Sequence, residues 1–295
     1  MKACLCDIRS WMINDKLMIN DSKTEFMRIG TKAQLQKTKR ATLTIGESII
    51  SPSTEPLRNL GAWFDCHFNL NFNITKTCRS AFFHLNNIRR VRKYLSIESA
   101  EKLVHAFITS RLDYCNSLLY GLPRCALTKL QRVQNAAARV LYLAPRYCHI
   151  TPILYELHWL PVTFRIEFKI IIITYKAIHG TAPNYLSSLV NFKPNSSYSL
   201  RSNNKYQLSN PNFRTFPTLG DRAFVATAPK VWNNLPLDLR CTSHFEVFKR
   251  NLKTHLFKKA FSDIMLYFNV VFFLRYIFRS LIVRYIFRSL IVRRI

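Results

Sequence analysis

Residues 10–30 read SWMINDKLMINDSKTEFMRIG, and the rest of the chain is best interpreted outward from this stretch. It begins with an amphipathic turn around Trp11 and Met12, passes through a polar corner, and ends in a short apolar run around Phe26 and Ile29. Helical spacing that gives way to a short apolar run across Asn and Asp residues predicts a helix, a turn and a strand in succession. The stretch therefore predicts a fold that mixes helices with short strands.

Residues 26–65 contain several short apolar runs separated by polar turns. Gly46, Pro52 and Pro56 interrupt these runs, and runs of this length with such interruptions predict strands and turns rather than helices. The last of them includes LGAWFD at residues 60–65, which predicts a tight turn with a tryptophan packed beside it.

From about Ile74 onward the apolar residues recur at three- and four-residue steps, which predicts amphipathic helices. The face of the first helix opposite the apolar one carries basic residues: Arg89, Arg90, Arg92 and Lys93. Ser96 is the expected N-cap of a second helix that runs to about Tyr120, and a third helix stops before Pro145. The outer face of the third helix carries Lys129 and Arg132. These three segments predict a basic helical bundle.

Residues 10–30 resemble the segment that follows the catalytic hairpin in the reverse transcriptases of non-LTR retrotransposons, of the LINE type and jockey-like. The residues that fill the positions of that pattern are Trp11, Met12, Asn14, Leu17, Asn20, Lys23, Thr24 and Glu25. Residues 60–65 resemble the primer-grip hairpin of the same enzymes, with Ala62 where valine is usual. Two further segments, 154–161 (LYELHWLP) and 220–239, resemble tail segments found in many members of this group.

The resemblance implies an α+β, mostly α fold: a palm edge with a primer-grip β-hairpin, a thumb-like helical bundle and a helical tail. The expected domains are a residual palm edge and primer-grip hairpin at 1–73, a thumb-like helical domain at 74–145, a basic and mostly helical C-terminal region at 146–260, and an apolar and basic tail at 261–295. An unrelated helical bundle would give the same periodicity. Only the order of the elements favours a thumb.

The resemblance also assigns roles to individual residues. Lys23 matches the lysine thought to help protonate the leaving pyrophosphate, and Leu60, Gly61 and Trp63 match the positions that grip the primer. Each assignment has a plainer alternative. A lysine in a polar turn is ordinarily a solvated charge, and the hairpin can equally be a tight turn with a packed tryptophan.

The chain lacks the residues that would hold catalytic metal ions. Polymerases clamp two metals with carboxylates, and reverse transcriptases use an adjacent Asp-Asp pair, whereas no two acidic residues are adjacent here. We therefore expect no cofactor bound by this chain, and magnesium only where a palm is supplied; enzyme activity is left open. The spacing of Cys241 and His244 does not form the two ligand pairs of a zinc site, so no metal ligands are predicted.

The net charge of +28 points to nucleic acid as the partner. Each phosphate that a basic side chain neutralises releases counterions and adds affinity without sequence readout. The candidate nucleic-acid-binding residues are those of the basic helical faces: Arg89, Arg90, Arg92, Lys93, Lys129 and Arg132. The alternative is that they form ordinary solvated helix faces. No phosphate-cradling glycine motif is present, so no small-molecule substrate is expected.

The C-terminal tail contains the nonapeptide RYIFRSLIV twice, at 275–283 and 284–292. Nine residues do not complete a whole number of helical turns or of strand repeats, so the two copies present different faces. The apolar run 261–274 is shorter than the roughly 20 residues that a membrane span needs, and a membrane partner is not expected. The scattered cysteines and the missing signal core predict a nuclear or cytoplasmic protein.

These observations leave three hypotheses. The first is a truncated RNA-directed DNA polymerase fragment of a retrotransposon that binds nucleic acid but is not catalytic alone. The second is a non-catalytic nucleic-acid-binding protein derived from such an enzyme. The third, which the sequence favours least, is a membrane-associated basic protein that uses the apolar run near its C-terminus.

Overall fold

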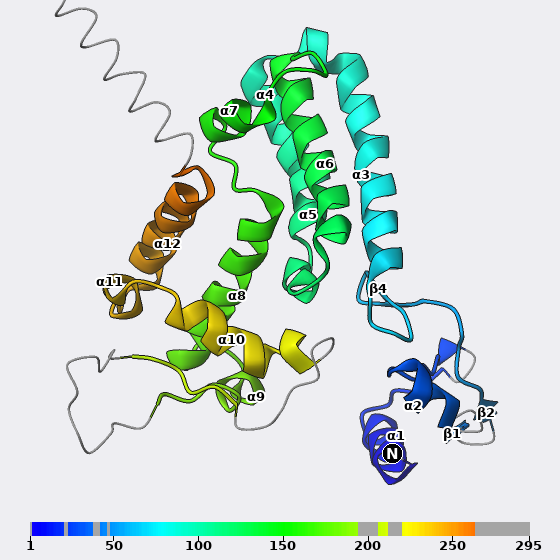
Figure 1. Ribbon diagram of the computed structural model, residues 1–295. Coiled ribbons are helices and arrows are strands. Elements are labelled where there is room, and N and C mark those ends of the chain that lie inside the picture. The colour runs from blue at the N-terminus through cyan, green and yellow to red at the C-terminus, as the bar shows by residue number, and fades with distance from the viewer. Residues whose placement is uncertain are drawn as a thin grey trace, which may run out of the picture.

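The computed structural model describes residues 2–20, 23–37, 42–45, 48–193, 206–211 and 220–262 (Figure 1). The expected tandem nonapeptide and most of the expected tail lie outside these residues. The described part is rich in helix and has two small antiparallel hairpins, which confirms a mostly helical α+β fold. None of its helices is long and apolar enough to cross a membrane.

The N-terminal elements are short. They are α1 (Lys2–Asn14), α2 (Lys32–Lys37), β1 (Leu43–Ile45), β2 (Ser48–Ile50), β3 (Leu57–Asn59) and β4 (Ala62–Phe64). β1 pairs with β2, and β3 pairs with β4 with Leu57 opposite Phe64 and Asn59 opposite Ala62. The expectation of short strands in residues 26–65 is confirmed for these two hairpins, whereas α2 replaces a turn. Gly30 joins this region to the second hairpin, because its N–H donates to the Cys66 carbonyl at 3.0 Å.

A bundle of helices follows the second hairpin. It contains α3 (Asn71–Val91), η2 (Arg92–Tyr94), α4 (Ile97–Val104), the π turn η3 (His105–Thr109), α5 (Ser110–Asp113), η4 (Asn116–Leu119) and α6 (Arg124–Tyr142). Figure 1 shows α3 and α6 side by side. The segment from α4 to α5 runs from the upper end of the bundle toward its lower end. The apolar stripe of α3 that faces this core is fully buried and includes Ile74, Ala81, Leu85 and Ile88.

The second expected helix is interrupted. Ser96 is its N-cap, since the Ser96 hydroxyl accepts a hydrogen bond from the Ser99 N–H at 3.2 Å. The helix then passes through η3 and ends at Asp113, seven residues before the expected end at Tyr120. Cys115 has a φ of 51° and reverses the chain there. The helix has already ended one residue earlier, because the backbone of Tyr114 is extended (φ −68°, ψ 120°) and leaves the right-handed helical ladder.

The C-terminal half packs on the same core. Its elements are α7 (Ile150–Glu156), α8 (Val162–Ile178), α9 (Asn184–Ser187), η5 (Gly220–Arg222), α10 (Phe224–Asn233), α11 (Leu237–Arg240) and α12 (Phe245–Ala260). Tyr175 of α8 joins several of these elements. Its ring stacks on the rings of Phe248 and His179, with centroid distances of 4.2 and 3.9 Å. Its hydroxyl donates to the Ser243 carbonyl at 2.5 Å. One cluster of buried side chains extends from Leu70 to Phe261.

The segment 220–239 fastens distant parts of this core to one another. The Arg222 guanidinium donates to the Phe68, Leu118 and Tyr120 carbonyls at 2.7, 3.1 and 3.2 Å. The Phe68 carbonyl belongs to the loop before α3, the Leu118 carbonyl to η4, and the Tyr120 carbonyl to the loop between η4 and α6. Further along the segment, the Trp232 indole N–H donates to the Tyr206 carbonyl at 2.9 Å. The segment therefore has a structural role that its sequence alone did not reveal.

Candidate nucleic-acid interface

A tyrosine from the helical bundle holds the turn between β3 and β4. Leu60 and Gly61 form this turn with φ angles of 45° and 86°, as in the type I′ turns that suit antiparallel hairpins. The Tyr114 hydroxyl, just after α5, donates a hydrogen bond to the Leu60 carbonyl. A Cβ at position 61 would lie 3.3 Å from the Tyr114 ring, and its φ is strained for any other residue. The side chain of Leu60 remains 86% exposed.

Trp63 anchors the hairpin to the start of α3. Its backbone N–H donates to the Asn73 side-chain oxygen at 3.0 Å, and its ring meets Phe72 edge-on at 5.1 Å. The Lys76 ammonium lies 5.7 Å from the Trp63 ring and 5.1 Å from the Phe72 ring, within cation–π range. Trp63 is thus partly packed, as the plainer alternative expected, and holds a cation at the surface.

A groove of about 630 Å³ lies between this hairpin, α3 and the end of α5. The described residues that line it are Arg58, Gly61, Trp63, Asn73, Lys76, Thr77, Ser80, Ser110, Arg111 and Tyr114. Three of them are cationic, several carry hydroxyl groups, and none carries a carboxylate. Arg111 is fixed in place, since it donates to the Ser80 hydroxyl at 3.1 Å and to the Phe107 carbonyl at 2.7 Å. This lining suits a polyanion that is bound through its backbone.

The groove continues into a stripe along the exposed face of α3. Lys76, Phe83 and Arg90 follow one another at seven-residue steps, so they lie on one face of the helix. The Phe83 side chain is 63% exposed between the two cations. At 1.5 Å per residue the stripe extends roughly 21 Å, which corresponds to about six phosphate spacings along one strand of duplex.

The structure divides the predicted basic residues between two faces. Arg90 belongs to the stripe, and Arg89 and Lys93 are exposed near it at the end of α3 and in η2. Lys129 and Arg132 are exposed on α6. Burial raises the pKa of the Cys78 thiol, and the nearby Lys129 ammonium lowers it. Lys129 and Arg132 belong to α6, which packs against α3, and neither is among the described residues that line the groove.

The expectation that Arg92 faces outward with its neighbours is wrong. Arg92 is only 8% exposed, and its guanidinium donates twice to the Leu141 carbonyl, at 3.0 and 2.6 Å, and once to the Leu95 carbonyl at 2.8 Å. Leu141 is in the last turn of α6, where carbonyls have no partner within the helix. Arg92 therefore caps α6 and joins it to α3, so it is not available to a phosphate.

Lys23 is exposed in a turn near the N-terminus and is not among the described residues that line the groove. Its backbone N–H donates to the side-chain oxygen of Asn20 at 3.1 Å, and the Thr24 hydroxyl donates to the Asn20 carbonyl at 2.9 Å. No group of three His, Cys, Asp or Glu side chains that could hold a metal occurs among the described residues. The geometry around Lys23 is that of a local polar turn.

Comparison of the chain with protein-family models, with curated proteins and with solved structures gave no match in any of the three. The candidate interface is therefore defined by its own geometry.

Of the ten described residues that line the groove, sequence reasoning named only Gly61 and Trp63; the eight that it missed include Arg58, Lys76, Arg111 and Tyr114. The seven-residue spacing from Lys76 to Arg90 was a usable signal, because it predicts a shared helix face. Arg111 and Tyr114 had no such signal, since they belong to a different helical segment. They reach the groove only through the reversal of the chain between α3 and α5.

Proposed function

We propose that this chain is the part of a non-LTR retrotransposon reverse transcriptase that follows the catalytic hairpin, and that it binds nucleic acid through its backbone. In this proposal the turn at Leu60 and Gly61 and the groove beside it contact the primer strand. The stripe on α3 extends the contact along the phosphates. The observation that carries the proposal is the groove at the hairpin turn, in which Arg58, Lys76 and Arg111 occur without a carboxylate.

The distribution of other groups supports backbone binding over base readout. The groove offers hydroxyl groups of Thr77, Ser80 and Ser110 in addition to its cations, and such groups contact phosphate and sugar oxygens in protein–DNA complexes. The exposed ring of Phe83 lies along the same stripe, where it can stack on an unpaired base. Binding of this kind is strong at low salt and tolerant of sequence.

Catalysis is not part of the proposal for this chain alone. Magnesium would be held only by a palm that supplies paired aspartates, and Lys23 would act only beside such a palm. A non-catalytic nucleic-acid-binding protein descended from the enzyme would use the same groove. Sequencing of transcripts across Met1 separates the two: an in-frame upstream segment with an aromatic-x-Asp-Asp hairpin supports the polymerase, and transcripts that begin at Met1 support the non-catalytic protein.

The binding itself is tested by fluorescence anisotropy with a labelled RNA–DNA duplex at a series of KCl concentrations. The test variant is Lys76→Gln/Arg90→Gln, which removes two charges from the groove and stripe. The matched control is Arg146→Gln/Lys258→Gln, which removes two exposed charges from other elements. Since each phosphate contact on a duplex contributes a slope of about −0.9 to log K against log salt, the test variant should reduce the slope by about 1.8.

The unmodified protein should bind with a steep negative salt slope, and the control variant should keep it. Equal loss in the test and control variants would show that binding is spread over the surface and is not located in the groove. Salt-independent binding would refute backbone recognition altogether.

A further inference from the structure

A second pocket, distinct from the groove, is formed by the segment 154–161 that the sequence singled out without a role. Four consecutive residues of this segment, Leu157 to Leu160, line a pocket of about 580 Å³. Its other walls come from α4, η3, α5, η4, α8 and α12. This volume is in the range of small-molecule sites, which are commonly 300–1,000 Å³.

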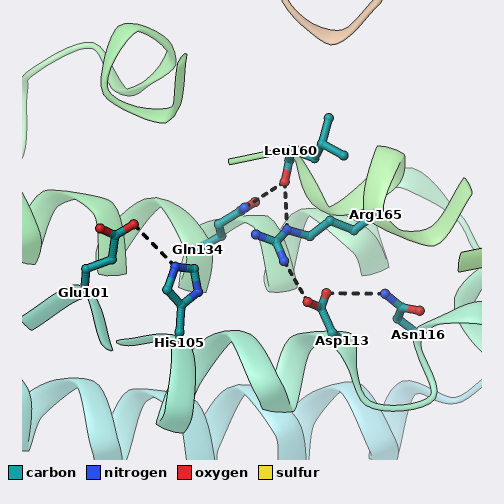
Figure 2. A network of polar contacts seen from close by, with 7 residues as sticks. All are labelled: Glu101, His105, Asp113, Asn116, Gln134, Leu160 and Arg165. Carbon is teal, nitrogen blue, oxygen red and sulfur yellow. Dashed lines mark hydrogen bonds and ion pairs between the residues drawn. The ribbon is translucent and has the colours of Figure 1, made fainter. Parts of the chain in front are cut away.

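The floor of this pocket is a fixed polar network, shown in Figure 2. The Arg165 guanidinium donates to the Asp113 carboxylate at 2.7 Å and to the Leu160 carbonyl at 2.9 Å, and Gln134 donates to the same carbonyl at 2.8 Å. The other carboxylate of the pocket, Glu101, lies 3.4 Å from a ring nitrogen of His105 (Figure 2). The Arg165 guanidinium thus neutralises the Asp113 carboxylate, which reduces its repulsion of an anion, and Glu101 is hydrogen-bonded to His105.

The rim of the pocket carries lysines from two helices. Lys169 of α8 and Lys249 and Lys253 of α12 line it, and all three are exposed. The Lys249 ammonium lies 3.6 Å from the Glu246 carboxylate. Both side chains are exposed, and such a pair contributes little to stability. These three lysines, from two helices, form a positive rim above a floor in which Asp113 is already ion-paired with Arg165. Phosphate is the anion that such clusters of basic side chains commonly bind.

The wall of the pocket is aromatic and contains buried polar atoms that lack partners. Trp159 is 3% exposed, and its ring lies 5.4 Å from that of His105. Within the described part of the chain, the Trp159 indole nitrogen and the Asn116 side-chain oxygen are buried without a hydrogen bond. Buried indole N–H groups usually find an acceptor, as that of Trp232 does.

We infer that this pocket binds a nucleoside phosphate, with the phosphate at the lysine rim and the base against the wall that includes Trp159 and Phe168. The inference does not depend on the proposed function, because the groove and this pocket share no lining residue. It departs from the expectation, drawn from the sequence, that no small molecule is bound. The nucleoside phosphate can be a free nucleotide or the 5′-terminal nucleotide of a strand.

Calorimetric titration of the full chain with adenosine, guanosine, cytidine and uridine monophosphates tests the site, with inorganic phosphate and the matching nucleosides as separate probes. Fluorine NMR of protein labelled with 5-fluorotryptophan reports the location, since the Trp159 signal can be assigned from a Trp159→Phe variant. The test variant is Lys169→Gln/Lys253→Gln. The control is Lys102→Gln/Lys258→Gln, which removes exposed lysines outside the pocket.

At least one nucleotide should bind saturably with a Kd below about 1 mM and shift the Trp159 signal. The test variant should weaken binding by about tenfold or more, whereas the control and the groove variant Lys76→Gln/Arg90→Gln should not. Tighter binding of a 5′-phosphorylated oligonucleotide than of its 5′-hydroxyl form, with the same Trp159 shift, would support the site and identify a strand end as the source. Equal affinity for inorganic phosphate, or no shift of Trp159 with any nucleotide, would overturn the inference.

Discussion

Replacement of Arg92 by alanine is expected to lower the free energy of unfolding by about 3 kcal/mol. The side chain is 8% exposed and donates three hydrogen bonds to two carbonyls, those of Leu141 and Leu95. Within α6, the partner of the Leu141 carbonyl would be the N–H of residue 145. That residue is a proline and has no N–H, so Arg92 supplies the partner that the helix itself lacks.

The magnitude follows from these two acceptors. Hydrogen bonds that involve a charged group contribute about 1.5–3 kcal/mol each, and the two donors that share the Leu141 oxygen are best counted once. The cost of burying the guanidinium offsets part of this sum, which leaves roughly 3 kcal/mol. Arg92→Lys should recover about half of the loss, because an ammonium reaches one carbonyl but does not span both.

Urea unfolding followed by far-ultraviolet circular dichroism measures the change, provided that the slope of free energy against urea stays constant. Arg89→Ala is the matched control, since Arg89 is exposed in the last turn of α3, three residues before Arg92, and its loss should stay within about 0.5 kcal/mol. A difference between Arg92→Ala and Arg89→Ala of less than about 1 kcal/mol would refute the capping role of Arg92.

Two further predictions concern Arg222 and Cys78. Arg222→Ala should speed amide hydrogen exchange in the loops before α3 and α6, because their carbonyls lose a shared donor. Arg146→Ala is the control and should leave exchange in both loops unchanged. Equal exchange rates in the two variants would contradict the role of Arg222. Burial raises the pKa of the Cys78 thiol while Lys129 lowers it, so Cys78 should react with iodoacetamide at pH 8 more slowly than the exposed Cys125. Lys129→Gln should slow the reaction of Cys78 further, since it raises the pKa of the thiol and reduces the thiolate fraction. Mass spectrometry measures these rates, with Lys102→Gln as the control. A faster reaction of Cys78 in Lys129→Gln would be inconsistent with this explanation.

Much of the helical fold could be predicted because burial along a helix is periodic. In α3 the buried residues recur at three-, four- and seven-residue steps, as expected from the apolar pattern. Ser96 could be assigned as an N-cap because its hydroxyl precedes an amphipathic run. The second hairpin was also predictable, since a glycine between short apolar runs predicts a turn with positive φ.

Contacts between elements distant in sequence could not be predicted in this way. Arg92 occurs beside Arg89 and Arg90, yet its partner carbonyl at Leu141 is 49 residues later. The Tyr114 hydroxyl reaches the hairpin turn at Leu60 across 54 residues. Periodicity describes one helix at a time, whereas the groove and the pocket depend on how helices pack together. The second expected helix ends early, and the residues at this end contribute to both sites: Asp113 lines the pocket and Tyr114 lines the groove.

The long reach of Arg222 has a consequence during synthesis of the chain. Phe68 and Arg222 are separated by 154 residues, and ribosomes add about 5–20 residues per second. The loop before α3 is therefore synthesised roughly 8–30 s before its hydrogen-bond donor. During that interval the hairpin and α3 can form locally. The loop between them gains its hydrogen bond to Arg222 only after the C-terminal half of the protein has been synthesised.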